Sequence, residues 1–301
     1  MKIPALLMCS LLATACANDV VIPLWPEGVP GAKPIPPEHV DERGFVTHIA
    51  VPTLTLQPAA CDRPTGTAVI LCPGGGYSGL SVEREGVQYA RWLSTLGVTT
   101  FILKNRVGDF GHPAPLQDVL RAVRIVRSRA AEFKVNPGRI GVMGSSAGGH
   151  LAACAGTLYD HPAGRTGAAL DAVGARPDFL ILMYPVITMD DPAAHAGSRQ
   201  QLLGAHPSPE LLRLLSPEKQ VTAATPPTLL IHTQEDRSVP VENSILFFQA
   251  LTRARVPAEM YLFEHGSHGM GMKPEFGTAS DWPQRAAEWL RHRGLLDPVK
   301  A

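Results

Sequence analysis

The feature that most restricts the fold of this chain is a regular alternation of short, continuously apolar segments with longer amphipathic ones. The apolar segments have the length and composition of buried strands, and they lie at residues 68–72, 98–103, 140–143, 179–186, 228–232 and 259–263. The amphipathic segments predict helices at residues 83–96, 116–133, 147–158, 241–253 and 281–291. Strands that alternate with helices favour a mostly parallel, twisted sheet with helices on both faces, so the predicted fold class is α/β.

Three regions depart from this alternation. Residues 18–45 are rich in Pro and Gly, which disfavours a helix or a central strand, and we predict an extended N-terminal arm that Trp25 anchors on the domain surface. Residues 48–56 alternate in part and predict antiparallel edge strands. Residues 190–225 are irregular, apart from a short helix near 209–215, and predict a small cap segment.

The first 17 residues contain one basic residue, a short apolar run and then small residues, a pattern typical of a bacterial export signal. With Ala15 and Ala17 in the small-residue positions, cleavage after Ala17 would send the protein to the periplasm or out of the cell. The alternative is a relaxed lipobox at 12–16, which would make Cys16 the lipid-anchored first residue of an outer-membrane lipoprotein. Simple export is favoured, because Ala13 stands three residues before the Cys, where an apolar residue is expected.

The rest of the chain, residues 46–301, has no internal repeat and predicts a single domain. Its composition is that of an ordinary globular protein, since 45% of all residues are hydrophobic and 18% are charged. Lys plus Arg number 27 and Asp plus Glu also number 27, so there is no electrostatic reason to expect a nucleic-acid partner, and a neutral substrate is compatible. No segment after the N-terminus is apolar enough to predict a membrane span.

Three cysteines remain once an export signal is removed, namely Cys61, Cys72 and Cys154. Their odd number prevents complete pairing, and we predict buried, unreactive thiols. No Cys or His spacing is typical of a metal site, so neither a metal nor a cofactor is expected.

The predicted helix 116–133 carries a run of arginines on the side opposite its apolar residues. We interpret this run as a solvated face of the helix rather than an anion site. It consists of Arg121, Arg124, Arg127 and Arg129.

Ligands of open α/β sheets bind at the carboxyl ends of the strands, and several strand ends of this chain carry unusual residues. After the strand 140–143 comes Gly144-Ser-Ser-Ala-Gly148, a G-x-S-x-G pattern in which a strained turn exposes the central Ser. Ser146 is therefore a candidate nucleophile. Taken alone, five small residues are also compatible with a plain tight turn.

A second unusual strand end is Cys72-Pro-Gly-Gly-Gly-Tyr77, in which three glycines follow a strand. Glycine lets backbone N–H groups approach a ligand closely, which suits an oxyanion site for acyl transfer. A phosphate loop is excluded because no Lys-Ser/Thr pair follows and the G-x-G-x-x-G spacing is missing. A purely structural turn remains the alternative.

Two further strand ends supply an acid and a base. Asp236 follows the strand 228–232, and His268 follows the strand 259–263 between glycines. Together with Ser146 they stand in the order nucleophile, acid, base that is typical of α/β hydrolases, so an acyl-transfer site is predicted.

Nearby residues offer alternatives for the acid and the base. Glu235 is the neighbouring carboxylate, and His265 precedes the glycine that frees the loop. His232 lies within a predicted strand and is expected to be a buried, hydrogen-bonded histidine.

Over residues 24–289 the chain resembles the carbohydrate-esterase branch of the α/β-hydrolase superfamily and is similar to bacterial acetylxylan-esterase-like proteins, some of them labelled as xylanases. The motifs that carry this resemblance are Cys72-Pro-Gly-Gly-Gly-Tyr77, Asp118-Val-Leu-Arg-Ala-Val-Arg124, Gly144-Ser-Ser-Ala-Gly-Gly-His-Leu151, Met183-Tyr-Pro-Val-Ile187, Pro226-Pro-Thr228, Asp236 with Val239-Pro240, and Gly266-Ser-His-Gly269. The resemblance implies an α/β-hydrolase fold, with Ser146 as nucleophile, Asp236 as acid and His268 as base.

The same resemblance implies an oxyanion hole formed by the backbone N–H groups of Gly75, Gly76 and Ala147. The chain departs from the family pattern at Pro73, where many relatives have His, so the choice of donor among the three glycines stays open. It departs again at Asn105-Arg106, where Tyr-Arg is expected, so substrate selection near that strand end could differ.

These observations predict a serine esterase that hydrolyses short-chain, mainly acetyl, esters of plant polysaccharides or oligosaccharides such as acetylated xylan. Within the same fold, the alternatives are a feruloyl esterase, a general carboxylesterase or a small peptidase. A glycoside hydrolase is disfavoured because no pair of strand-end carboxylates is apparent. From a different class, a non-catalytic sugar-binding protein is the remaining alternative, although all three residues of the predicted triad are present.

Overall fold

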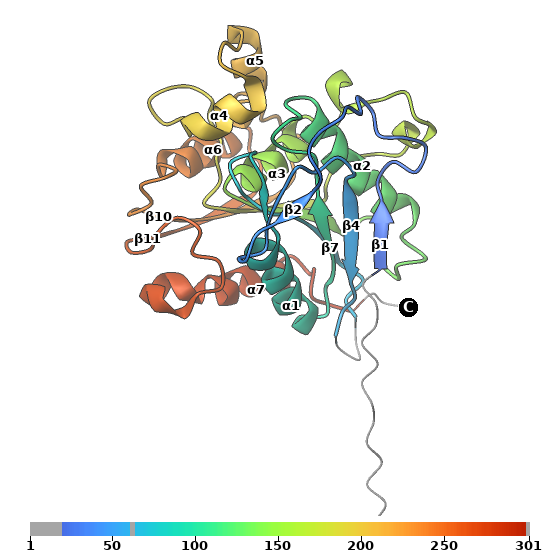
Figure 1. Cartoon of the computed structure of the whole chain (residues 1–301). Helices are drawn as coiled ribbons and strands as arrows, with labels where there is room; N and C mark the ends of the chain where they lie inside the picture. Colours follow the sequence, from blue (N-terminus) through green and yellow to red (C-terminus); the bar gives the residue numbers. More distant parts are fainter. Residues whose placement is uncertain (1–19, 61–63, 299–301) are drawn as a thin grey trace, which may run out of the picture.

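The computed structural model describes residues 20–60 and 64–298, and Figure 1 shows a central sheet with helices on both faces. The expectations for the export signal at 1–17, for lipidation at Cys16 and for the thiol of Cys61 lie outside these residues. The main sheet has the strand order β1-β4-β7-β5-β8-β9-β10-β11. In that order the strands are Val20–Pro23, Thr53–Gln57, Thr99–Lys104, Ala68–Cys72, Ile140–Ser145, Phe179–Met183, Thr228–Thr233 and Ala258–Phe263.

Only the first three strands of this order pair antiparallel, and the other neighbours are parallel. The carboxyl ends of β5, β8, β10 and β11 therefore meet at one edge of the sheet, which is where the sequence places its unusual residues. The structure confirms the α/β class and the six predicted strands, and β4 pairs antiparallel as predicted, although it lies between β1 and β7 rather than at the edge. Strand β9 ends earlier than expected because Tyr184 has φ +35° and Pro185 follows it.

The helices form two layers. On one face lie α2 (Ala114–Ser128), α3 (Ala147–Thr157) and α6 (Glu242–Arg253), and on the other lie α1 (Gln88–Thr95) and α7 (Trp282–His292). Strand β5 shows why two cores form: Ile70 packs into the first and its neighbour Leu71 into the second, since successive strand residues point to opposite faces. The expected helix 83–96 is divided, because Val82–Val87 forms a π-helical turn (η1) before α1 begins.

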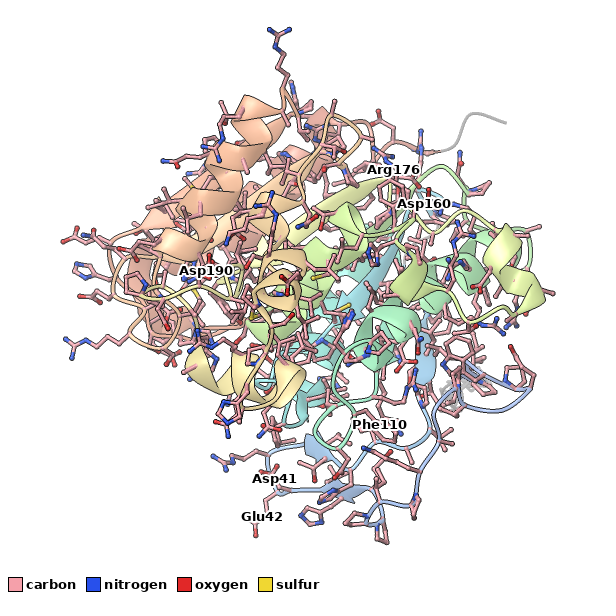
Figure 2. The ribbon with its side chains drawn as sticks, turned by 90° about the horizontal axis from the view of Figure 1, so that it is seen from above. Asp41, Glu42, Phe110, Asp160, Arg176 and Asp190 are labelled. Carbon is pink, nitrogen blue, oxygen red and sulfur yellow. The ribbon has the colours of Figure 1, made fainter. Side chains whose placement is uncertain are left out.

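The N-terminal segment is built into the domain more closely than the prediction of an arm over 18–45 implies. Its first described residues form β1, an edge strand that pairs with β4. Trp25 anchors this segment, as predicted: its side chain is buried, its Nε1 donates to Asp118 Oδ1 at 2.8 Å, and the Arg121 guanidinium lies over its ring. Figure 2 shows this segment near Asp41 and Glu42, on the same side of the molecule as the loop of Phe110.

A second, three-stranded sheet joins the end of this segment to the loop after β5. It consists of β2 (His39–Val40), β3 (Phe45–Thr47) and β6 (Leu80–Ser81).

The prediction of a solvated arginine face on α2 is wrong for two of its four members. Arg121 is buried and pairs with Glu27 at 2.6 Å, and Arg124 is buried and pairs with Asp171 at 3.1 Å. The N-terminal segment and the turns η2 (Pro162–Gly164) and η3 (Ala169–Ala172) pack over this side of the helix and supply the partners. Helical periodicity identifies the side away from the sheet, but it does not reveal what covers that side.

The irregular segment 190–225 contains α4 (Ala196–Leu203), α5 (Pro209–Leu214) and the short turn η4 (Pro217–Lys219), and only α5 was expected. Both helices lie above the sheet in Figure 1, and Figure 2 looks down on the segment, with Asp190 labelled at its start. A further 3-10 turn, η5 (Pro274–Asp281), precedes α7.

The structure also bears on the predictions for the cysteine thiols and for membrane-spanning segments. Cys72 and Cys154 are buried free thiols, as predicted. Among residues 20–60 and 64–298, no helix has the length and hydrophobicity needed to cross a membrane.

Candidate active site

Ser146 stands in a strained turn between β8 and α3, with φ +55° and ψ −123°. The flanking glycines are required by close backbone contacts. A Cβ on Gly144 would lie 2.1 Å from the carbonyl oxygen of Gly148, and one on Gly148 would lie 2.0 Å from that of Cys72. Strain of this kind persists only where the surroundings impose it, and here it presents Ser146 Oγ at the carboxyl edge of the sheet.

The structure brings the three residues of the predicted triad together. His268 Nε2 lies 2.8 Å from Ser146 Oγ, and His268 Nδ1 lies 2.7 Å from Asp236 Oδ2. The loop after β10 carries Asp236, and the loop after β11 carries His268. An imidazole bonded in this way donates from Nδ1 to the carboxylate and accepts the hydroxyl proton at Nε2.

The carboxylate of Asp236 is held by several donors. Its Oδ1 accepts from the backbone N–H groups of Ser238 and Val239, each at 2.9 Å. Burial raises the pKa of this carboxyl, but the hydrogen bonds from His232 and His268 outweigh burial and hold the pKa well below its usual range. Asp236 is therefore ionised at neutral pH and accepts the hydrogen bond from Nδ1 of its imidazole partner.

The alternative acid and bases have other partners, and one of them, His232, contacts the acid of the triad, with its Nε2 3.3 Å from Asp236 Oδ2. Glu235 and His265 are exposed and pair with each other at 3.1 Å. His232 is buried, as predicted, and bonds to Ser244 Oγ and the carbonyl oxygen of Val239. None of the three has a hydrogen bond to Ser146 among the described residues.

The glycine loop after β5 runs beside this triad. The N–H group of Gly74 donates to Glu85 Oε2 at 2.7 Å and is therefore already occupied. Within the described part of the chain, the N–H groups of Gly75 and Gly76 have no acceptor. Gly75 has φ +144° and Gly76 has φ +63°, and the N–H group of Ala147 begins α3 nearby. Of the three glycines, Gly75 and Gly76 are thus the two whose backbone N–H groups can donate to an oxyanion.

The far end of the loop is tied to α3. Tyr77 has φ +61°, and its hydroxyl lies 2.7 Å from His150 Nδ1, while His150 Nε2 lies 2.8 Å from the carbonyl oxygen of Leu215. These contacts fit a neutral imidazole that donates from Nε2 and accepts at Nδ1. Burial lowers the pKa of His150 to about 4.

Two cavities adjoin the site. A small one of about 10 Å³ is lined by residues that include Gly75, Ala147 and Asn105, whose Oδ1 has no hydrogen-bond partner among the described residues. A larger one, of about 370 Å³, is lined by His268 and by residues of the two neighbouring loops, among them Glu235, Arg237 and Ser238. Of the pair expected to influence substrate selection, Asn105 thus lies at the site, whereas Arg106 is buried and pairs with Asp118 at 2.8 Å.

Sequence reasoning missed two residues beside the site. Glu85, in the turn η1, is a buried carboxylate that contacts the glycine loop. His195 begins α4 and is half-buried, and burial, followed by the charge of His268, lowers its pKa. Neither residue lies in a recognisable motif. The one signal for Glu85 was its charge within a segment that is predicted to form a helix with a buried face.

Among the described residues, no group of three or more His, Cys, Asp or Glu side chains is arranged to hold a metal ion.

Comparison with known proteins places these features in context. A family model described as BD-FAE matches residues 57–251. The chain is 34% identical over 234 residues to an acetylxylan esterase of Xylanibacter ruminicola, covering 76% of this chain and 46% of the relative. It is 37% identical over 206 residues to endo-1,4-beta-xylanase B of Butyrivibrio fibrisolvens, covering 67% of this chain and 32% of the relative. The chain therefore spans less than half the length of these two proteins.

Solved structures are similar over most of both chains. A crystal structure of an acetyl ester-xyloside bifunctional hydrolase from Caldicellulosiruptor lactoaceticus has 38% identity and a TM-score of 0.79, covering 92% of this chain and 97% of that one. The carboxylesterase Cest-2923 from Lactobacillus plantarum has 27% identity and a TM-score of 0.68, covering 88% of this chain and 99% of that one.

Proposed function

The chain belongs to the BD-FAE family and has the α/β-hydrolase fold, and from this premise we propose that it is a serine esterase. Its substrates are short-chain, mainly acetyl, esters of plant polysaccharides or oligosaccharides such as acetylated xylan. The observation that carries the proposal is the unbroken contact from Asp236 through His268 to Ser146, at 2.7 Å and 2.8 Å.

In the first half of the reaction, Ser146 Oγ attacks the ester carbonyl carbon while its proton passes to His268 Nε2. The carbonyl oxygen becomes an oxyanion that accepts from the N–H groups of Gly75, Gly76 and Ala147. Each such donor stabilises the transition state by about 3 kcal/mol. The tetrahedral intermediate then expels the alcohol, which takes the proton from His268, and the acyl group stays on Ser146.

In the second half, water replaces the alcohol. His268 takes a proton from the water as the water oxygen attacks the acyl carbon, and the same oxyanion donors act again. Collapse of this intermediate releases the carboxylic acid and returns the proton to Ser146. Asp236 stays ionised throughout and orients the imidazole.

The sizes of the two cavities support a small acyl group and a larger alcohol. The small cavity of about 10 Å³ beside Gly75 and Ala147 has room for about one methyl group or water. The cavity of about 370 Å³ at His268 is much larger, and its lining includes Glu235, Arg237 and Ser238, whose side chains can hydrogen-bond to a sugar alcohol. Relatives named as an acetylxylan esterase and as an acetyl ester-xyloside hydrolase agree with this assignment.

Acetate release tests the proposal over a panel of acetylated xylan, acetylated pectin, simple acetylated sugars and feruloyl esters. We expect release from the acetylated carbohydrates, with xylan fragments preferred. Activity on feruloyl esters alone would replace the substrate but keep the reaction. Reducing sugar released from deacetylated xylan would indicate glycoside hydrolysis instead.

Export is part of the same proposal. Residues 1–17 act as an export signal, so that the enzyme meets polymer fragments in the periplasm or outside the cell. Determining the first residue of the mature protein tests this, with residue 18 expected. A mature chain that begins at a lipid-modified Cys16 would support the lipoprotein alternative.

A further inference from the structure

Glu85 is a buried carboxylate that contacts the active-site loop without being part of the triad. The residue is 5% exposed and lies in the turn η1, a π-helical turn of the kind that often marks functional sites. Burial raises the pKa of its carboxyl, and hydrogen bonds from Gly74 and Tyr184 act in the opposite direction. Burying a carboxyl group costs free energy unless its oxygens accept hydrogen bonds. The hydrogen bonds of Glu85 therefore explain how the fold accommodates it.

Both carboxylate oxygens have a partner at the active site. Oε2 accepts from the N–H group of Gly74 at 2.7 Å, and Oε1 accepts from the Tyr184 hydroxyl at 2.8 Å. Gly74 has no room for a side chain, because a Cβ would lie 2.8 Å from Glu85 Oε2 and 2.9 Å from Ser146 Cβ. Glu85 therefore holds the backbone directly beside the nucleophile.

A chain of hydroxyl groups ends on the same carboxylate. Ser145 Oγ donates to the Tyr89 hydroxyl at 3.3 Å, which lies 3.1 Å from the Tyr184 hydroxyl. The ring of Tyr184 also packs edge-on against the imidazole of His268, with centroids 5.1 Å apart. The Glu85 carboxylate is thus connected to the glycine loop, to the turn that carries Ser146, and to Tyr184, which packs against His268.

The two ends of the glycine loop are fixed in different ways. Glu85 fixes Gly74 at the start, and the contact of Tyr77 with His150 fixes the end. Because Gly74 donates to Glu85, only the two glycines between these anchors keep free N–H groups. The anchors therefore select Gly75 and Gly76 as the oxyanion donors.

We propose that Glu85 is a positioning residue for ester hydrolysis: its carboxylate holds the oxyanion loop through Gly74 and holds Tyr184 against His268. This inference rests on the proposed esterase function. Glu85 does not touch the substrate, so its removal weakens an interaction made mainly in the transition state. The expected effect is a lower kcat with little change in KM.

Three substitutions at position 85 separate positioning from general stability. E85M keeps the volume but removes both acceptors, E85D withdraws the carboxylate by one methylene, and E85Q keeps an acceptor for Gly74. E83Q is the matched control, because Glu83 lies in the same turn but is exposed, and its carboxylate pairs with Arg91 at 3.8 Å. Each variant is titrated with a fluorophosphonate so that rates refer to folded, reactive sites.

For 4-nitrophenyl acetate we expect kcat per active site to fall about 100-fold in E85M and about tenfold in E85D, with KM within threefold of wild type. E85Q stays within about fivefold, and E83Q is unchanged. The affinity for a boronic acid, which forms a tetrahedral adduct with serine, falls by the same factor as kcat/KM.

A kcat within threefold of wild type in E85M, or in E85D should E85M not fold, contradicts the positioning role. A loss in E85Q as large as that in E85M contradicts it as well, because Gln keeps the acceptor that Gly74 needs. A wild-type protein that hydrolyses no ester would instead overturn the proposed function, so the two failures are distinct.

Discussion

Asp236 and Glu85 are two buried carboxylates at one active site, each 5% exposed, and their surroundings move their pKa values in opposite directions. Asp236 accepts from two backbone N–H groups and two histidines, and its pKa is held far below the usual range. Glu85 has two donors, Gly74 and Tyr184, and burial raises its pKa. The comparison shows that the donors around a buried carboxyl decide its role: Asp236 is the charged partner of an imidazole, and Glu85 is an anchor for backbone.

The largest expected effect separates these two roles by rate. Asp236→Asn lowers kcat by about 10⁴-fold, because the amide favours the wrong tautomer of His268 and cannot stabilise its protonated form. This loss is about 100-fold larger than that of E85M. Steady-state kinetics with 4-nitrophenyl acetate measure both, and Glu235→Gln, at the neighbouring exposed carboxylate, is the control, with a loss below tenfold. Equal losses at positions 236 and 85 would contradict the division of roles.

His150 extends the comparison from buried carboxyls to a buried imidazole, which becomes a cation when it is protonated. Its pKa is lowered from 6.5 to about 4, so the unfolded chain binds the proton more readily than the folded one. The stability that this group contributes is complete above pH 6.5 and is lost as pH falls from 6.5 towards 4. We expect the free energy of unfolding to decrease by up to about 3 kcal/mol over that window.

Urea unfolding at pH 7 and pH 4.5 measures this loss in wild type and in His150→Gln. The Gln variant loses less over the window, because its amide does not titrate and still reaches Tyr77 and Leu215. A His150→Gln variant with the same pH dependence as wild type would show that another group is responsible.

Most of the fold and the triad could be predicted from the sequence because their signals are local. Each strand is a continuous apolar run, and Ser146, Asp236 and His268 each follow such a run directly. Parallel strands bring their carboxyl ends together, so chain order alone gathers these residues at one edge.

What the sequence did not predict depends on contacts between distant segments. The π-helical turn shifts the helical register at Glu85, so a carboxylate faces inward where an uninterrupted α-helix was expected. Arg121 and Arg124 are buried by segments far from α2 in sequence. Helix α4 has no apolar stripe over its sequence Ala-Gly-Ser-Arg-Gln-Gln-Leu-Leu, and it was missed for that reason.

A smaller effect tests the far end of the oxyanion loop. Tyr77→Phe removes the hydroxyl that bonds to His150 and leaves that imidazole nitrogen with the weak contact to Cys154 Sγ at 3.8 Å. We expect kcat to fall about tenfold at unchanged KM, less than in E85M, because the steric limits on the loop remain. Kinetics normalised by active-site titration measure the change, and a loss larger than that of E85M would reverse the ranking of the two anchors.

The smallest effect concerns the serine beside the nucleophile. The side chain of Ser145 is buried, and its hydroxyl donates to the Tyr89 hydroxyl at 3.3 Å. Ser145→Ala removes the last member of the hydroxyl chain, so we expect a loss of about 1 kcal/mol in the free energy of unfolding and less than a tenfold change in kcat. Thermal and urea unfolding give the stability. A loss of kcat comparable to that of Asp236→Asn would contradict the assignment of Ser146 as the nucleophile.

The central claim is that Ser146 carries the acyl group during ester hydrolysis. Acetate release from acetylated xylan by wild type and by Ser146→Ala, with fluorophosphonate labelling of both proteins, tests it most directly. The account predicts that the substitution lowers the rate by at least about 10⁴-fold and abolishes the label, which peptide mapping places on Ser146 in wild type. A Ser146→Ala protein that releases acetate at the wild-type rate, or a label on another residue, would contradict it.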